Sequence, residues 1–168
     1  LAVLTALFVA EGKLALTDQV KTCVPELQND FDATIEDLLR YRVQGVRMSS
    51  LRFQTFEEIR THALERGFSG PPAESLYTNL PAFVLGIVIE RVGGASLATL
   101  AHRDIFDPLE MSETTFFPAA DRCAPTEIVG GETILGIPHD ESARVFARAR
   151  RTVGHAGLFS SAKDLLTF

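Results

Sequence analysis

The sequence predicts a mainly α-helical fold with few short strands. Residues 55–58 have the Thr-x-x-Glu pattern of a capping box, which opens a helix. Asn79, Pro81 and the apolar run that follows them indicate a second helix that is buried on most faces. From residue 112 to 157 the hydrophobic periodicity weakens, which is typical of long irregular connections.

The first helix is predicted from the apolar run Leu1–Ala10, in which Thr5 is the only polar residue. Gly12 is expected to end it, because glycine accepts the left-handed conformation at a helix C-terminus. We interpret this segment as a core helix that protein covers on all sides. Ten residues are too few to cross a bilayer, which takes about 20, so no transmembrane segment is expected.

Cap-forming side chains predict four further helices, which begin after Thr34, Thr55, Asn79 and Ser96. The helix after Thr55 should end at Gly67, and the helix after Ser96 should end at Asp107-Pro108. Two short extended segments are expected at Thr114–Phe117 and Glu132–Leu135.

Composition and charge exclude several classes of protein. The chain has 168 residues, 46% of them apolar and 23% charged, which is ordinary for a single globular domain. Its 22 acidic and 16 basic residues give a net charge of −6, so a nucleic-acid partner is not expected. Cys23 and Cys123 form neither a disulfide framework nor a zinc pattern.

His139 and His155 lie near carboxylates in the irregular region, where metal binding is one interpretation. No second histidine follows at helical spacing, so we favour a loop held by side-chain hydrogen bonds and expect no metal or cofactor. A local basic cluster follows in the sequence, and a solvated face is favoured for it over an anion contact. This cluster consists of Arg144, Arg148, Arg150 and Arg151.

Two short motifs resemble those of serine hydrolases but are not assigned that role. Residues 160–163 match Ser-x-x-Lys, in which the lysine amine lies one helical turn from the serine hydroxyl. Because the match opens a helix, Ser160 is interpreted as a helix-capping residue. Ser69 lacks the full Gly-x-Ser-x-Gly spacing and is interpreted as a loop residue.

Tyr77 and Asn79 stand where the chain enters the apolar helix. A tyrosine near the positive end of a helix dipole is suited to handing on a proton. On this segment alone, an aromatic ring packed under a turn is the favoured explanation of Tyr77.

Tyr77-Thr78-Asn79 and several other segments follow one another in an order that resembles the serine β-lactamase-related family, which includes class C β-lactamases, DD-peptidases and esterases. Tyr77-Thr78-Asn79 is similar to the Tyr-x-Asn motif of that family. The resemblance covers most of residues 1–39 and 72–168. The other matching segments are Leu7–Val20, Pro25–Leu27, Thr34–Leu39, Glu90–Leu97, Ile105–Thr114, Ala124–Glu127, Pro138–Ala143 and Gly154–Ala162.

The resemblance implies that residues 1–168 are the helical subdomain of a β-lactamase/transpeptidase-like α+β fold. The parent would transfer acyl groups from a β-lactam, a peptidoglycan peptide or a small ester through an acyl-enzyme. Tyr77 would be its proton shuttle, and Asn79 would hydrogen-bond the substrate amide or the catalytic lysine. The family's serine and lysine would fall before Leu1, and its Lys-Thr-Gly segment after Phe168, so this piece alone is expected to be inactive.

The chain departs from the family pattern at Tyr41–Gly45, at Glu110 and in the basic stretch Arg144–Val153. Two alternatives stay open: a non-catalytic binding or regulatory module derived from the family, and an unrelated helical interaction domain. Without sheet cover, the Leu1–Ala10 helix would be exposed and is expected to favour self-association. For the parent we expect a location in the cell envelope or outside the cell.

Overall fold

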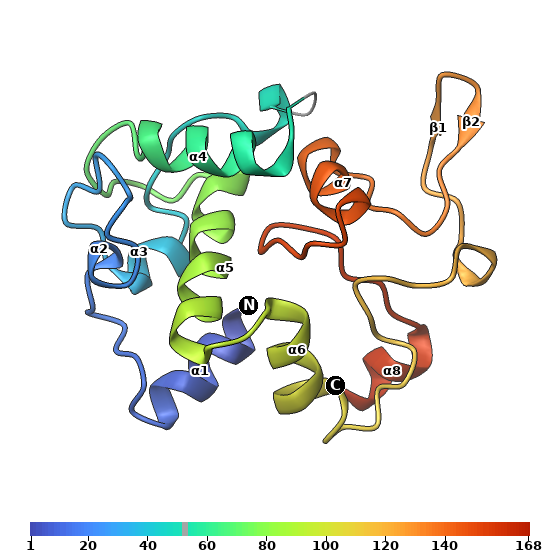
Figure 1. Ribbon diagram of the computed structural model, residues 1–168. Coiled ribbons are helices and arrows are strands. Elements are labelled where there is room, and N and C mark those ends of the chain that lie inside the picture. The colour runs from blue at the N-terminus through green and yellow to red at the C-terminus, as the bar shows by residue number, and fades with distance from the viewer. Residues whose placement is uncertain (52–53) are drawn as a thin grey trace.

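A computed structural model of the chain describes residues 1–51 and 54–168, and it is mainly helical as predicted (Figure 1). The longer helices are α1 (Ala2–Ala10), α4 (Phe56–Arg66), α5 (Asn79–Gly93) and α7 (Glu141–Arg148). The shorter α-helices are α2 (Val20–Cys23), α3 (Ile35–Leu39), α6 (Leu97–Ala101) and α8 (Ala162–Thr167). The remaining turns of helix are η1 (Met48–Leu51), η2 (His102–Phe106) and η3 (Ala120–Arg122).

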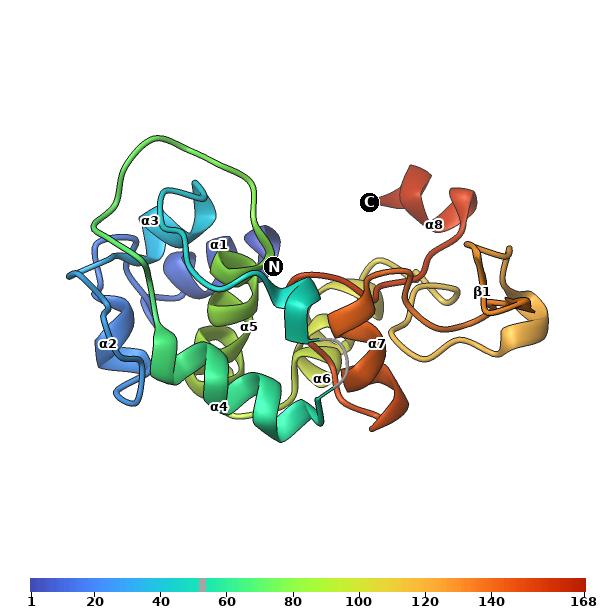
Figure 2. The same ribbon diagram turned by 90° about the horizontal axis from the view of Figure 1, so that it is seen from above.

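Helix α5 is the centre of the packing. Its residues from Leu80 to Ile89 are all buried, and the helix contacts α2, α3 and α6. Burial on every side explains why this stretch has no polar face. Figure 2 shows α4 and α7 lying along one edge of the molecule, with α5 behind α4.

Three of the predicted caps are present. Thr34 and Thr55 each accept a hydrogen bond from a backbone N–H of their helix and form complete capping boxes with Asp37 and Glu58. Ser96 accepts from the Thr99 N–H at the start of α6. These caps satisfy N–H groups that have no partner within the helix.

The prediction for Asn79 was wrong in its position. The cap residue of α5 is Thr78, and Asn79 is the first residue of the helix. Its side chain makes no capping bond and is turned toward Asp140, whose carboxylate accepts a hydrogen bond from it.

The second half differs from the expectation in two further respects. Helix α7 was not predicted, although Asp140 caps it by accepting from the Ala143 N–H. The only strands among the described residues are β1 (Ile128–Val129) and β2 (Glu132–Thr133), which pair antiparallel with Val129 opposite Glu132. The Thr114–Phe117 segment is not a strand and makes one isolated bridge, from Thr115 to Phe159.

Helix α1 is covered on one face only, as expected for this helix when no sheet covers it. Leu4, Thr5 and Phe8 are buried, whereas Val3 is 38% exposed. In the part of the chain that the structure describes, no single helix is long and apolar enough to cross a membrane. Helix α5 and residues 97–106, bent by 72° with respect to each other, are together long and apolar enough to cross a membrane by length and composition alone.

The loop that carries His155 packs directly against α5. A Cβ atom built on Gly154 would lie 2.2 Å from the Ala82 carbonyl oxygen, and one built on Gly86 would lie 2.9 Å from the Gly154 Cα. Both neighbours are backbone atoms, which cannot move aside as a flexible side chain can. The two glycines therefore allow residues 153–155 to approach the helix.

We expect Gly154→Ala to lower the free energy of unfolding by about 1–3 kcal/mol, because the added methyl group forces the loop away from α5. Gly70→Ala is the matched control, since a Cβ there meets no atom within 4 Å. Urea unfolding followed by circular dichroism measures both. Equal stability of the two variants would contradict the close approach.

Candidate active site

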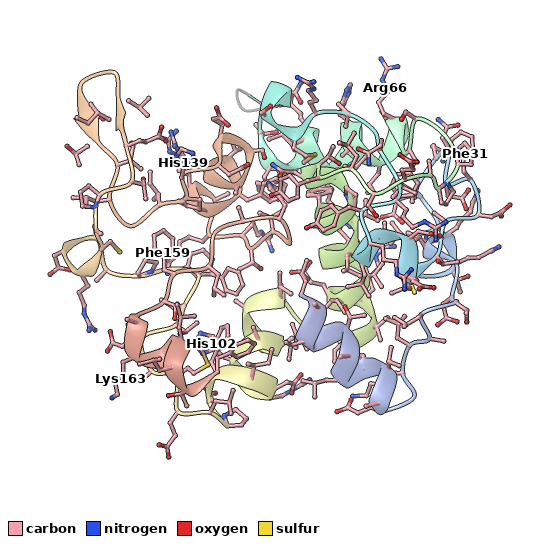
Figure 3. All side chains as sticks on the ribbon, turned by 180° about the vertical axis from the view of Figure 1, so that it is seen from behind. Phe31, Arg66, His102, His139, Phe159 and Lys163 are labelled. Atoms are coloured by element: carbon pink, nitrogen blue, oxygen red, sulfur yellow. The ribbon has the colours of Figure 1, made fainter. Side chains whose placement is uncertain are left out.

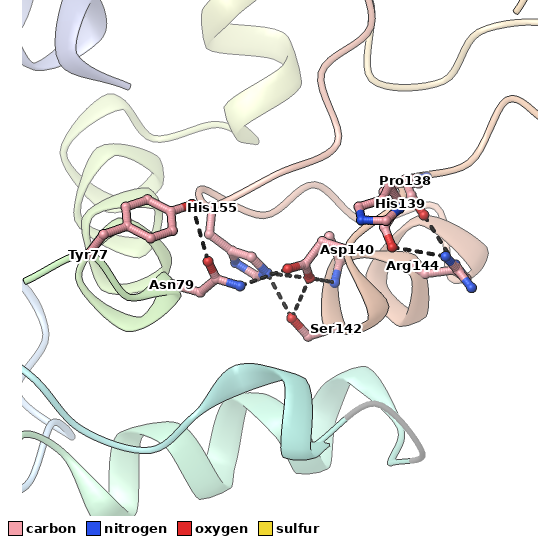
Figure 4. Close-up of polar contacts among 9 residues, drawn as sticks. Tyr77, Asn79, Pro138, His139, Asp140, Ser142, Arg144 and His155 are labelled. Atoms are coloured by element: carbon pink, nitrogen blue, oxygen red, sulfur yellow. Dashed lines mark hydrogen bonds and ion pairs between the residues drawn. The ribbon is translucent and has the colours of Figure 1, made fainter. Parts of the chain in front are cut away.

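Tyr77 lies on the extended segment just before α5 and is 72% exposed. Its ring packs against Tyr41 with centroids 5.2 Å apart, and its hydroxyl donates to Asn79 Oδ1 at 3.5 Å (Figure 4). The phenol is thus beside the first turn of α5 with its oxygen open to solvent. The structure brings the two predicted site residues together.

The segment before Tyr77 is tied to residues 41–44. The Leu76 N–H donates to the Tyr41 carbonyl, and the Ala73 N–H donates to the Arg42 carbonyl. Gln44 donates from Nε2 to the Leu76 carbonyl at 2.8 Å. The stretch that departs from the family pattern therefore holds the tyrosine-bearing segment in place.

Asn79 links this segment to the second half of the chain. Its Nδ2 donates to Asp140 Oδ2 at 2.7 Å, although the two residues are 61 positions apart. A carboxylate oxygen can only accept, so the amide nitrogen must face Asp140 and the amide oxygen must face Tyr77. The orientation of the Asn79 amide is therefore set by Asp140.

Asp140 is the hub of the network (Figure 4). Its Oδ1 accepts from the Ser142 hydroxyl at 2.7 Å, from the Ala143 N–H at 2.9 Å and from His155 Nε2 at 3.2 Å. Its other oxygen accepts from Asn79. One carboxylate thus caps α7, holds the His155 loop and orients the amide at the start of α5.

His155 is a buried part of this network, with its side chain only 1% exposed. Ser142 donates its hydroxyl proton to Asp140, so it accepts from His155 Nε2, which lies 2.9 Å away. The Nε2–H is therefore shared between Ser142 and Asp140. His155 Nδ1 is buried and has no partner among the described atoms.

The environment of Asp140 favours its charged form. Burial opposes ionisation, but hydrogen bonds from His155, Ala143 and Ser142 outweigh it and hold the pKa of the Asp140 carboxyl well below its usual range. The site therefore contains a carboxylate that stays ionised under mildly acidic conditions.

Asp140, Ser142 and His155 were not predicted as site residues, although a loop held by side-chain hydrogen bonds was expected around His155 and is confirmed. The sequence signal for them was the match of residues 138–143 and 154–162 to the family. Among the described residues, no three His, Cys, Asp or Glu side chains are grouped to hold a metal ion. His102 and His139 lie on separate elements (Figure 3).

Arg144 is buried, so the solvated face predicted for the basic cluster is wrong at this position. Its guanidinium donates to the Pro138 and His139 carbonyls and pairs with Glu127. These bonds fix the loop that precedes Asp140.

The assignment of Ser160 as a helix cap is also wrong. Ser161 caps α8 by accepting from the Asp164 N–H. The Ser160 hydroxyl instead lies 2.8 Å from the Thr114 hydroxyl.

We expect Asp140→Asn to lower the free energy of unfolding at pH 7 by about 1.5–3 kcal/mol, because hydrogen bonds to a charged acceptor are lost. A carboxyl with a lowered folded-state pKa stabilises above its unfolded-state pKa, about 4, and this contribution disappears as the pH falls toward the folded-state value. The free energy of unfolding, measured with urea, should therefore fall more between pH 7 and pH 3 for the wild type than for Asp140→Asn.

Asp121→Asn, at an exposed carboxylate on η3, is the control, and its free energy of unfolding should equal that of the wild type at both pH values. An Asp140→Asn variant as stable as this control would contradict the role of Asp140 as a hub.

Comparison with known proteins supports the resemblance noted in the sequence. A family model described as Beta-lactamase matches residues 1–168. A putative D-alanyl-D-alanine carboxypeptidase of Escherichia coli K12 is 27% identical over 195 residues, which cover 93% of this chain and 44% of that protein. The chain therefore spans less than half the length of this curated relative.

Solved structures give the same fold. FmtA from Staphylococcus aureus superposes with a TM-score of 0.77 at 19% identity, covering 98% of this chain and 45% of that one. A D-stereospecific amidohydrolase from Streptomyces sp. gives a TM-score of 0.75 at 19% identity, covering 99% of this chain and 56% of the other. With the family model matched along all 168 residues and the predicted helical subdomain confirmed, the chain belongs to the beta-lactamase family.

Proposed function

We propose that this chain is the helical part of a serine hydrolase that transfers an acyl group from an amide or ester, with Tyr77 as the proton shuttle. The observation that carries the proposal is the exposed Tyr77 hydroxyl beside an asparagine whose amide is fixed from the far side by Asp140. The substrate class rests on the family: a β-lactam, a peptidoglycan peptide or a small ester.

In this proposal the reaction begins when a serine hydroxyl attacks the substrate carbonyl and forms an acyl-enzyme, which water later hydrolyses. Tyr77 takes part in moving the serine proton to the leaving group, because its phenol is open to solvent and held by Tyr41 on one side. The attacking serine and its lysine belong to a part of the protein outside these 168 residues, so the chain alone does not turn over substrate.

Asn79 is proposed as an orienting residue. One N–H of its amide is committed to Asp140, and one lone pair of its oxygen faces the Tyr77 hydroxyl. A primary amide has a second N–H and a second lone pair. The free lone pair suits an ammonium group such as the catalytic lysine, and the free N–H suits a substrate carbonyl.

The test uses a protein that carries this chain together with a Ser-x-x-Lys nucleophile. Tyr77→Phe keeps the ring and removes the hydroxyl, so kcat should fall by about 10²–10⁴-fold with little change in KM. The substrates are p-nitrophenyl acetate and nitrocefin, and kcat is measured across pH.

Tyr41→Phe is the matched control, since it also removes one phenolic hydroxyl but leaves the ring contact intact. It should retain the wild-type kcat and pH profile. The 168-residue chain alone should show no turnover that a serine-directed inhibitor blocks. A Tyr77→Phe enzyme as active as Tyr41→Phe would refute the proton-shuttle role.

We also propose that the exposed face of α1 mediates self-association of this chain. Val3 lines an apolar cavity of about 330 Å³ between α1, α6 and α8, and this cavity also includes Leu158, Leu165 and Phe168. The last three are each at least half exposed. Apolar surface of this kind favours association in water.

Sedimentation analysis of the 168-residue chain should therefore show a dimer that forms as concentration rises. Val3→Ser should weaken the dimer, because a hydroxyl replaces part of the apolar contact. Thr22→Ser, at an exposed position on α2 away from this cavity, should leave dimer formation unchanged. A chain that stays monomeric throughout would contradict this proposal.

A further inference from the structure

A separate cavity of about 250 Å³ lies between the first turn of α4, the middle of α5 and the segment after α7. Neither Tyr77 nor Asn79 lines it. Aromatic rings form much of its wall, and three of them are in contact: Phe146 lies 5.9 Å from Phe56 and 5.8 Å from Phe83, centroid to centroid. The wall is suited to an apolar or aromatic body.

Two arginines of the basic cluster are held at this cavity by aromatic rings. The Arg150 guanidinium lies 4.5 Å from the centroid of Phe117, and the Arg151 guanidinium lies 5.4 Å from the centroid of Phe56. A guanidinium stacked on a ring keeps its N–H edge free for an anion. Neither arginine has a carboxylate partner among the described residues.

The charges around the cavity are unequal. Among the described residues of the lining, Arg60 is a third guanidinium and Glu90 is the one carboxylate. Glu90 already accepts from the Leu97 N–H at 2.8 Å and from the Thr152 hydroxyl at 3.5 Å. Arg60 is 3.6 Å from Glu26, which also pairs with Arg91. Among the described residues that line the cavity, three side chains are positive and one is negative, so the cavity attracts anions.

We propose that this cavity binds a small aromatic anion, with Arg150 and Arg151 holding a phosphate or carboxylate group and the phenylalanines holding the ring. Oxyanions fit the forked N–H geometry of guanidinium groups, and charge-assisted hydrogen bonds are the stronger class. The proposal stands independently of the catalytic role of Tyr77, because none of its residues belongs to the Tyr77–Asp140 network.

The experiment is a two-dimensional NMR titration of the folded 168-residue chain with phenyl phosphate, inorganic phosphate and phenol. Phenyl phosphate should bind saturably, shift the amide signals of residues 150–154 and weaken as salt is added. Inorganic phosphate and phenol should each bind at least about tenfold more weakly, since each lacks one of the two recognised groups.

The double variant Arg150→Gln/Arg151→Gln should reduce phenyl phosphate affinity by at least about tenfold. Arg148→Gln is the matched control, because Arg148 is an exposed arginine of the same cluster that does not line the cavity. The proposal is overturned if phenyl phosphate does not bind at millimolar concentration, if phenol binds equally well, or if the control loses as much affinity as the double variant.

Discussion

One carboxylate, that of Asp140, joins the two halves of this chain. It accepts hydrogen bonds from the start of α5, from the first turn of α7 and from the loop that carries His155. A carboxylate has enough lone pairs for all of these donors, and a neutral amide in the same place does not. The arrangement of the candidate active site therefore depends on a single charged side chain.

This arrangement separates the supporting groups from the proposed proton shuttle. The supporting groups, His155 and Ser142, are buried or nearly so, whereas the Tyr77 hydroxyl is open to solvent. Asn79 lies between them, and its hydrogen bonds connect the buried network to the exposed phenol. The proposed role of Tyr77 requires precise geometry at an accessible group, and a buried hydrogen-bond network can supply it without covering the phenol. The close approach of Gly154 to α5 makes the same network compact.

The helix caps could be predicted because each depends on a few consecutive residues, as at Thr55 and Ser96. Asn79 could not be placed by local reasoning, since its partner lies 61 residues away. Helix α7 was missed although its cap, Asp140, is also local, because residues 112–157 were expected to form irregular connections. The Tyr77–Asn79 pair was found through the order of family motifs, and its supporting contacts required the fold.

The most direct test of the Asp140 hub is the protonation of the His155 ring, measured by nitrogen NMR of the folded chain at neutral pH. Nε2 faces a carboxylate and a serine oxygen, so it should carry a proton that exchanges slowly with water. A ring protonated on Nδ1 alone would place a bare nitrogen against the carboxylate. That result would contradict the network on which the positions of Asn79 and Tyr77 depend.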